Sequence, residues 1–280
     1  MIYKLNVETV YCIGDVHGAL RGVAGHIKRY DLHDCALIFC GDIGFGFEKD
    51  EYYEQVYRKL RPLLSKQNIY LFFLRGNHDN PSFFDDKRIA HKRFTAVSDY
   101  SVIQSFALED VEKTTQTHSV LCVGGATSVD RSLRKQEMQK LAHQYKRFHA
   151  CDMEHALTHC KQLYWANETP IFDESSLQKL HGQGIHIDAV CTHTCPSFCE
   201  PTRKDDIAHF VAIDPTLEQD VNAERDTMDK LYERLIQDGH SLRYWYYGHF
   251  HYHSSAYFDN TYFCMIDMER DGIYDMMEVR

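Results

Sequence analysis

Short apolar segments alternate along this chain with longer amphipathic ones. Residues 69–74 read IYLFFL, and a run that is apolar at every position predicts a strand buried on both faces of a sheet. Residues 50–64 instead carry apolar side chains at the spacing of an amphipathic helix. Because strands that alternate with helices build sheets covered by helices, the pattern predicts the α/β class.

The same criteria locate elements along the whole chain. Further strands are expected at residues 10–13, 36–40, 120–123, 187–191, 242–247, 255–258 and 262–266. Further helices are expected at residues 20–30 and 217–237. Residues 128–184 interrupt the alternation, because they are polar, rich in His and mostly helical in pattern. We therefore expect a single domain over residues 1–280, with a helical insertion or cap at about 128–184.

Composition excludes several classes of protein. A chain of 280 residues that is 44% hydrophobic and 26% charged is neither disordered nor of low complexity. The apolar runs are far shorter than the roughly 18–20 residues that span a bilayer, so no membrane association is expected. The net charge of −10 disfavours nonspecific binding of nucleic acid, which is expected only as a substrate. The first 12 residues lack the features of a secretory signal, which predicts a cytoplasmic protein whose ten cysteines are reduced thiols.

Five of the predicted strands are followed by polar residues of the same chemical kind. These segments read GDVHG from Gly14, GDIG from Gly41, RGNHD from Arg75, THT from Thr192 and GHFH from Gly248. The carboxyl ends of strands border the ligand crevice of an open α/β sheet, so the five segments can converge on one place. One such motif is common by chance, but five in succession after apolar strands indicate a functional site.

The side chains in these segments are typical of a metal site. Mixed carboxylate, imidazole and amide ligands suit Mn, Fe, Zn or Ni better than Mg or Ca, which prefer oxygen alone. Seven ligands are too many for one tetrahedral ion but suit two ions that share a carboxylate.

The ordered set GDVHG, GDIG, GNHD, THT and GHFH resembles the calcineurin-like metallophosphoesterase superfamily over residues 14–251. The resemblance implies two packed mixed β-sheets flanked by helices, a four-layer α/β/β/α sandwich with a two-metal centre at the sheet edge. It implies that one metal binds Asp15, His17 and His251. It implies that the other binds Asn77, His193 and His249, with Asp42 bridging both. Manganese is the metal expected first, with iron, zinc and nickel as alternatives.

The same resemblance implies a metal-dependent phosphoester hydrolase in which the two metals activate a hydroxide. His78 is expected to stabilise the transition state or protonate the leaving oxygen, and Arg75 to contact a phosphate oxygen. Eukaryotic-type protein phosphatases carry GDxVDRG at the second motif, whereas this chain reads GDIGFGF, so that branch's orienting Asp and phosphate-binding Arg have no counterpart there. Arg131 and Arg134 lie in a basic segment at residues 130–147, and because they follow the Gly124-Gly125 turn they are expected to reach the site and bind substrate.

Three functions are compatible with these residues. The first is a phosphomonoesterase acting on a phosphorylated small molecule or phosphoprotein. Residues 124–131, with Trp165 and Glu168, are similar to small bacterial and phage members, some of them known as serine/threonine phosphatases. The alternative is a phosphodiesterase, nuclease or dinucleotide polyphosphate hydrolase, because the same metal pair can expel a nucleotide. A non-catalytic scaffold stabilised by metal ranks last, because the ligand set is complete.

Overall fold

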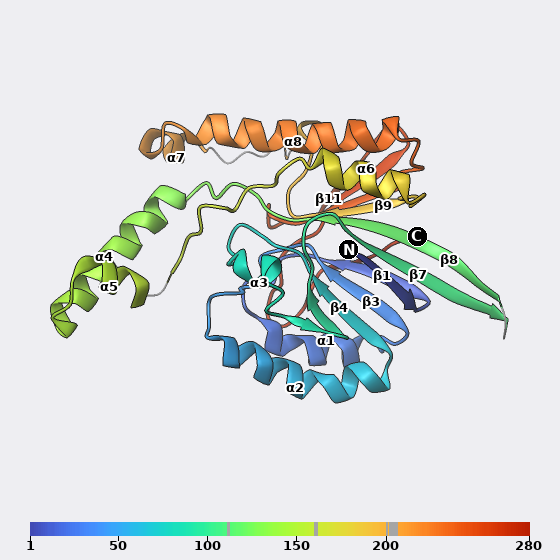
Figure 1. Ribbon diagram of the computed structural model, residues 1–280, viewed down its shortest axis with the longest axis horizontal. Helices are drawn as coiled ribbons and strands as arrows, with labels where there is room; N and C mark the ends of the chain where they lie inside the picture. Colours follow the sequence, from blue (N-terminus) through green and yellow to red (C-terminus); the bar gives the residue numbers. More distant parts are fainter. Residues whose placement is uncertain (111–112, 160–161, 200, 202–206) are drawn as a thin grey trace.

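The computed structural model describes residues 1–110, 113–159, 162–199, 201 and 207–280. Two β-sheets pack face to face, and helices cover the outer face of each sheet (Figure 1). This arrangement is the four-layer α/β/β/α sandwich expected from the sequence. Within the described part of the chain, every helix is too short or too polar to traverse a lipid bilayer.

The six-stranded sheet positions the first three polar segments. Its order is β13 (Met276–Glu278), β2 (Thr9–Ile13), β3 (Cys35–Phe39), β4 (Ile69–Phe73), β6 (Phe94–Ala96) and β5 (Ala90–His91). Strands β2, β3 and β4 are parallel, with Ile13 opposite Phe39 and Phe39 opposite Phe73. Because this register brings the three strands to an end at one level, the segments that follow them emerge side by side.

The seven-stranded sheet positions the other two segments. Its order is β1 (Ile2–Asn6), β7 (Ser101–Asp110), β8 (Lys113–Val123), β9 (Ala189–Thr192), β10 (Tyr244–Tyr247), β12 (Thr261–Met265) and β11 (Ser254–Phe258). Strands β9 and β10 are parallel neighbours, whereas β7 with β8 and β11 with β12 are antiparallel pairs. The sheet is therefore mixed, and the ends of β9 and β10 lie together.

Three hydrophobic clusters separate the four layers. The first lies between the six-stranded sheet and the helices α1 (Val23–Arg29) and α2 (Asp50–Lys66). The third lies between the seven-stranded sheet and the helices α6 (Glu174–Gly182) and α8 (Leu217–Gln237). The second fills the space between the sheets and contains the buried free thiols of Cys12, Cys40, Cys122, Cys191 and Cys264. These cysteines behave as small apolar residues, as expected for reduced thiols.

The predicted helical segment at 128–184 forms two separate parts, a projecting hairpin and a helix that packs on the seven-stranded sheet. Helices α4 (Arg131–His149) and α5 (Met153–His159) form a hairpin that projects from the layers (Figure 1). Helix α6 instead packs on the seven-stranded sheet through Leu177 and Leu180. Only the α4–α5 hairpin therefore has the position of an insertion.

Several elements were not predicted from the sequence. Short helices occur without a sequence prediction at α3 (Ser82–Asp85), η2 (Ser197–Cys199) and α7 (Ala208–Ile213), whereas η1 (Leu20–Gly22) and α1 together form the helix expected at residues 20–30. The expected strand at residues 120–123 is the end of the much longer β8, which pairs with β7. Residues 115–118 of β8 read TQTH and are exposed or half-buried, and their backbone pairs with β7.

Candidate metal centre

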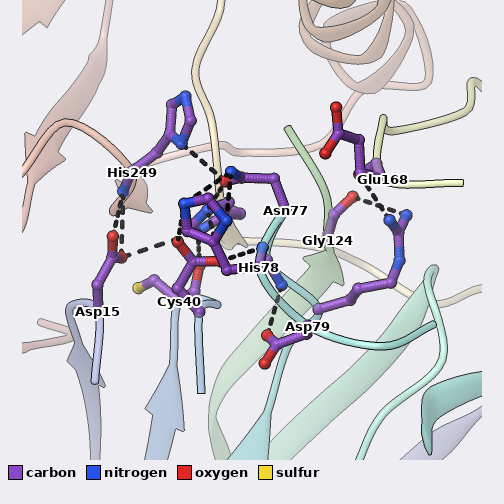
Figure 2. A network of polar contacts seen from close by, with 12 residues as sticks. Asp15, Cys40, Asn77, His78, Asp79, Gly124, Glu168 and His249 are labelled. Carbon is purple, nitrogen blue, oxygen red and sulfur yellow. Dashed lines mark hydrogen bonds and ion pairs between the residues drawn. The ribbon is translucent and has the colours of Figure 1, made fainter. Parts of the chain in front are cut away.

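All seven predicted ligands lie together where the ends of the two sheets meet, and Figure 2 shows Asp15, Asn77 and His249 among them. Asp15, Asp42 and Asn77 follow strands β2, β3 and β4 of the six-stranded sheet. The three histidines follow strands of the seven-stranded sheet; they are His193, His249 and His251. His17 completes the set, two residues after Asp15. The site is thus shared between the two sheets.

One group of donor atoms gathers around Asp15. His251 Nε2 lies 3.1 Å from Asp15 Oδ2 and 3.0 Å from His17 Nε2. His17 Nε2 is also 3.8 Å from both Asp15 Oδ2 and Asp42 Oδ2. One donor atom from each of these four residues lies within 4.8 Å of the others. Among the described residues, this is the one cluster of His, Cys, Asp or Glu with the spacing of a metal site.

A second group of donor atoms gathers around Asn77. The amide Oδ1 of Asn77 lies 2.9 Å from His193 Nε2 and 3.0 Å from His249 Nδ1 (Figure 2). His193 Nε2 is 3.4 Å from Asp42 Oδ1. Asp42 therefore presents one carboxylate oxygen to each group, which is the position of a bridging ligand.

These separations fit metal coordination. Donor atoms that lie about 2.1 Å from one cation and at right angles to each other are about 3.0 Å apart. The observed 2.9–3.1 Å separations involve imidazole nitrogens, an amide oxygen and a carboxylate oxygen, all of which are ordinary ligands of transition-metal ions. The residues present therefore fit a pair of divalent cations that share Asp42.

Burial and charge set the protonation of the ligands. Burial opposes ionisation of Asp42, but the neighbouring His193 and His78 hold the pKa of its carboxyl well below its ordinary value. Burial lowers the pKa of His249 well below its ordinary value, which leaves the ring neutral and able to bind a cation. Burial also acts to lower the pKa of His193, but Asp42 and Asp15 outweigh it and raise that pKa to about 10. A cation bound here competes with the His193 proton.

The backbone around the ligands is unusual. His17, Asp42, His249 and His251 all have positive φ angles, of 47°, 49°, 71° and 57°. Residues other than glycine rarely adopt this conformation, and such strain concentrates at functional sites. A Cβ atom on Gly76 would lie 2.0 Å from Asp42 Oδ1, so only glycine allows this close approach to the bridging carboxylate.

Backbone amides hold the two aspartates in place. The His249 N–H donates to both carboxylate oxygens of Asp15 at 3.1 Å. The His78 N–H donates to Asp42 Oδ1 at 2.8 Å. The backbone of His249 therefore orients Asp15, and the backbone of His78 orients Asp42, as expected for a preorganised site.

His78 and Arg134 face the metal centre together. His78 Nε2 lies 4.0 Å from Asp42 Oδ2 and 3.4 Å from Arg134 Nη2. Burial lowers the pKa of His78, although Asp42 opposes this shift. Both side chains line a cavity of about 610 Å³ over the ligands. The Arg134 Nε–H donates to both carboxylate oxygens of Asp130, and substrate binding by Arg134 stays a prediction.

Arg75 and Arg131 differ from the sequence expectation, because neither lines this cavity. The Arg75 guanidinium donates to the backbone carbonyls of Asn167 and Glu168 and to Asp99. Arg131 donates to Asp214 Oδ2 at 2.7 Å and also bonds to Asp220 and Thr216. Both guanidinium groups are buried and hold protein segments together. The sequence could not show this, because their partners lie far away along the chain.

Sequence reasoning gave no role to Asp79. Its buried carboxylate accepts backbone N–H bonds from Ile43, Gly44, Phe45 and Gly76, at 3.1, 2.7, 2.9 and 2.9 Å. Burial raises the pKa of Asp79 to about 7, although these bonds oppose the shift. Asp79 thereby fastens the loop after β3 to the loop after β4, which carry Asp42 and Asn77. The sequence did contain a signal for this role, because Asp79 ends the GNHD motif, two residues after the expected ligand Asn77.

Glu224 and Arg225 were also not predicted, and they line the cavity from helix α8. Glu224 Oε1 accepts from Thr194 Oγ1 at 2.5 Å and from Arg225 Nη1 at 2.6 Å. The Arg225 guanidinium lies 5.1 Å from the centre of the Phe250 ring. Residues that follow His193 and His249 thus contact α8. No local pattern in the α8 sequence distinguishes this pair from ordinary surface charges.

Comparison with known proteins identifies a family over most of the chain. The family model described as calcineurin-like phosphoesterase matches residues 8–253. No curated protein matches the chain.

Several solved structures are similar at low identity. A dimetal phosphatase from Danio rerio is 12% identical with a TM-score of 0.42, over 94% of this chain and 88% of that one. The Plasmodium protein GAP50, described as the anchor in the inner membrane complex, is 10% identical with a TM-score of 0.44, over 96% and 81%. A candidate 5′-nucleotidase from Staphylococcus aureus is 13% identical with a TM-score of 0.40, over 93% and 48%. This chain thus spans about half the length of the nucleotidase.

Proposed function

The chain belongs to the calcineurin-like phosphoesterase family, and from this premise we propose that it hydrolyses phosphomonoesters with two divalent cations. As a member of this family it is a metallophosphoesterase, a hydrolase that acts on phosphoester bonds. The observation that carries the proposal is the position of Asp42, which presents one oxygen to each of two groups of donor atoms. Asp15, His17 and His251 would hold one cation, and Asn77, His193 and His249 the other. Manganese is the metal proposed, because it accepts both nitrogen and oxygen ligands.

The chain's own residues support hydrolysis at this centre. A bound pair of cations would supply a hydroxide near neutral pH and would bind phosphoryl oxygens. The His78 ring lies beside Asp42 and lines the cavity, and in its protonated form it can donate a proton to the departing oxygen. Arg134 can donate charge-assisted hydrogen bonds to a phosphate oxygen.

Arg134 supports a monoester as the substrate. A phosphomonoester has more phosphate oxygens free to accept hydrogen bonds than a diester, and Arg134, which Asp130 holds through Nε, lines the cavity with its Nη2 group beside His78. A phosphorylated small molecule and a phosphoprotein both carry a phosphomonoester group. Action on a serine/threonine phosphoprotein and a cytoplasmic location stay predictions.

Two model substrates assayed with Mn test the proposal. We expect turnover of 4-nitrophenyl phosphate, and slower turnover of bis(4-nitrophenyl) phosphate. Hydrolysis of the diester alone would indicate a phosphodiesterase, nuclease or dinucleotide polyphosphate hydrolase instead. Bound Mn without turnover of any phosphoester in a broad panel would indicate the non-catalytic scaffold.

A further inference from the structure

We propose that Ser128 and Glu168 are positioning residues that present the amide oxygen of Asn77 to the metal centre. The Asn77 Nδ2 group donates to Ser128 Oγ at 2.8 Å. Ser128 in turn donates twice to the Glu168 carboxylate, from Oγ to Oε2 at 2.6 Å and from the backbone N–H to Oε1 at 2.9 Å. All three side chains are buried. The inference rests on the proposed function, since Asn77 is a ligand only if the metals bind.

The direction of these hydrogen bonds fixes the orientation of the Asn77 amide. A serine hydroxyl has one proton and two acceptor lone pairs. Because the Ser128 proton goes to the Glu168 carboxylate, its oxygen is left as an acceptor for the Asn77 NH₂ group. The amide oxygen is then turned the other way, toward His193 Nε2 and His249 Nδ1. The Glu168 carboxylate therefore determines that the oxygen of the Asn77 amide, and not its NH₂ group, faces the proposed metal site.

Glu168 is itself held by Arg75, which lies in the loop between β4 and Asn77. Arg75 donates to the Glu168 carbonyl at 2.6 Å and to the Asn167 carbonyl at 2.9 Å. The Ala126 N–H donates to the same Glu168 carbonyl at 3.1 Å. Arg75 lies two residues before Asn77, so one short segment carries both the ligand and the anchor of its positioning group. This arrangement gives Arg75 a role that does not require contact with substrate.

Two variants and a matched control test the inference. Ser128→Ala removes the acceptor for Asn77. Glu168→Gln keeps the size of the side chain but cannot accept from both donors of Ser128, because one of its two polar atoms is an NH₂ group. Ser176→Ala is the control, because Ser176 also donates through its N–H and Oγ to one carboxylate, that of Asp173 at the start of α6. Ser128→Thr restores a hydroxyl.

The readout is Mn binding, measured by calorimetric titration of protein stripped with EDTA. We expect one of the two sites to lose about 10–100-fold in affinity in Ser128→Ala and Glu168→Gln, while the other site changes little. Ser176→Ala should match the wild type, and Ser128→Thr should recover most of the affinity. Wild-type binding at both sites in Ser128→Ala and Glu168→Gln would overturn the inference, as would equal weakening of both sites. A wild-type protein that binds no Mn would instead overturn the proposed function.

Discussion

The carboxylate of Asp42 has one oxygen beside each group of ligands, and its main chain is held at a positive φ angle. Gly76 allows the closest approach to Oδ1, and the His78 N–H donates to that same oxygen. These contacts fix the carboxylate before any cation binds. A preorganised bridging ligand lowers the cost of assembling two like charges at a short distance.

Asp42→Asn should reduce metal binding at both sites. The substitution keeps the side chain's shape but removes its negative charge and one acceptor oxygen. We expect the Mn content of purified protein, measured by elemental analysis, to fall from two ions per chain to fewer than one. Asp226→Asn, at an exposed position on α8, should keep both ions. Full metal content in Asp42→Asn would show that Asp42 does not bridge.

His78→Ala should separate turnover from metal binding. His78 borders the cavity and is not one of the seven proposed ligands, so both ions should remain bound. We expect kcat on 4-nitrophenyl phosphate to fall by about 10²–10⁴-fold, the range typical of a lost general acid. His33→Ala, at an exposed ring, is the control. An unchanged kcat in His78→Ala would remove His78 from the mechanism.

Among the elements, loops between strands and helices carry the site, and buried side chains fix those loops. Asp79 joins the loop after β3 to the loop after β4 through backbone N–H bonds. The strands before these loops were predictable, because residues 36–40 and 69–74 are apolar throughout. The β7–β8 hairpin could not be predicted from the sequence, because the polar start of β8 has no hydrophobic pattern. Long-range pairing, which no local pattern encodes, decides its conformation.

Asp79→Ala should loosen both loops. Removing the carboxylate leaves buried N–H groups without their acceptor, which costs about 2–4 kcal/mol in the free energy of unfolding. Urea unfolding of the metal-free protein measures this loss. Asp173→Ala is a matched control, because its carboxylate also accepts N–H and hydroxyl bonds but lies at the start of α6, where we expect a loss of about 1 kcal/mol. Equal losses in the two variants would contradict a special role for Asp79.

In the whole molecule, the candidate metal centre lies where both sheets end, and each sheet supplies some of the seven proposed ligands. The sequence predicted this convergence, because the five motifs each follow an apolar strand. It could not predict the partners of Arg75 and Arg131. Asp99 and Asp214 come from loops and Asp220 from helix α8, and the positions of all three relative to the arginines depend on the finished packing.

Because the ligands come from both sheets, metal binding should stabilise the entire fold. A ligand at 100 times its Kd contributes about 2.7 kcal/mol for each site. For a protein of this size, each kcal/mol raises Tm by about 2–4 °C, so two sites predict a rise of about 10–20 °C. Differential scanning calorimetry with Mn and with EDTA measures this shift. Calcium, which prefers oxygen ligands alone, should raise Tm less; an equal rise with Mn and calcium would contradict the mixed-ligand site.

A manganese anomalous difference map from crystals grown with Mn examines the paired centre directly. We expect two peaks about 3.5–4 Å apart, one on each side of the Asp42 carboxylate. The peak nearer Asp15 should be bordered by His17 and His251, and the other by Asn77, His193 and His249. A single peak, or two peaks that do not share Asp42, would contradict the account.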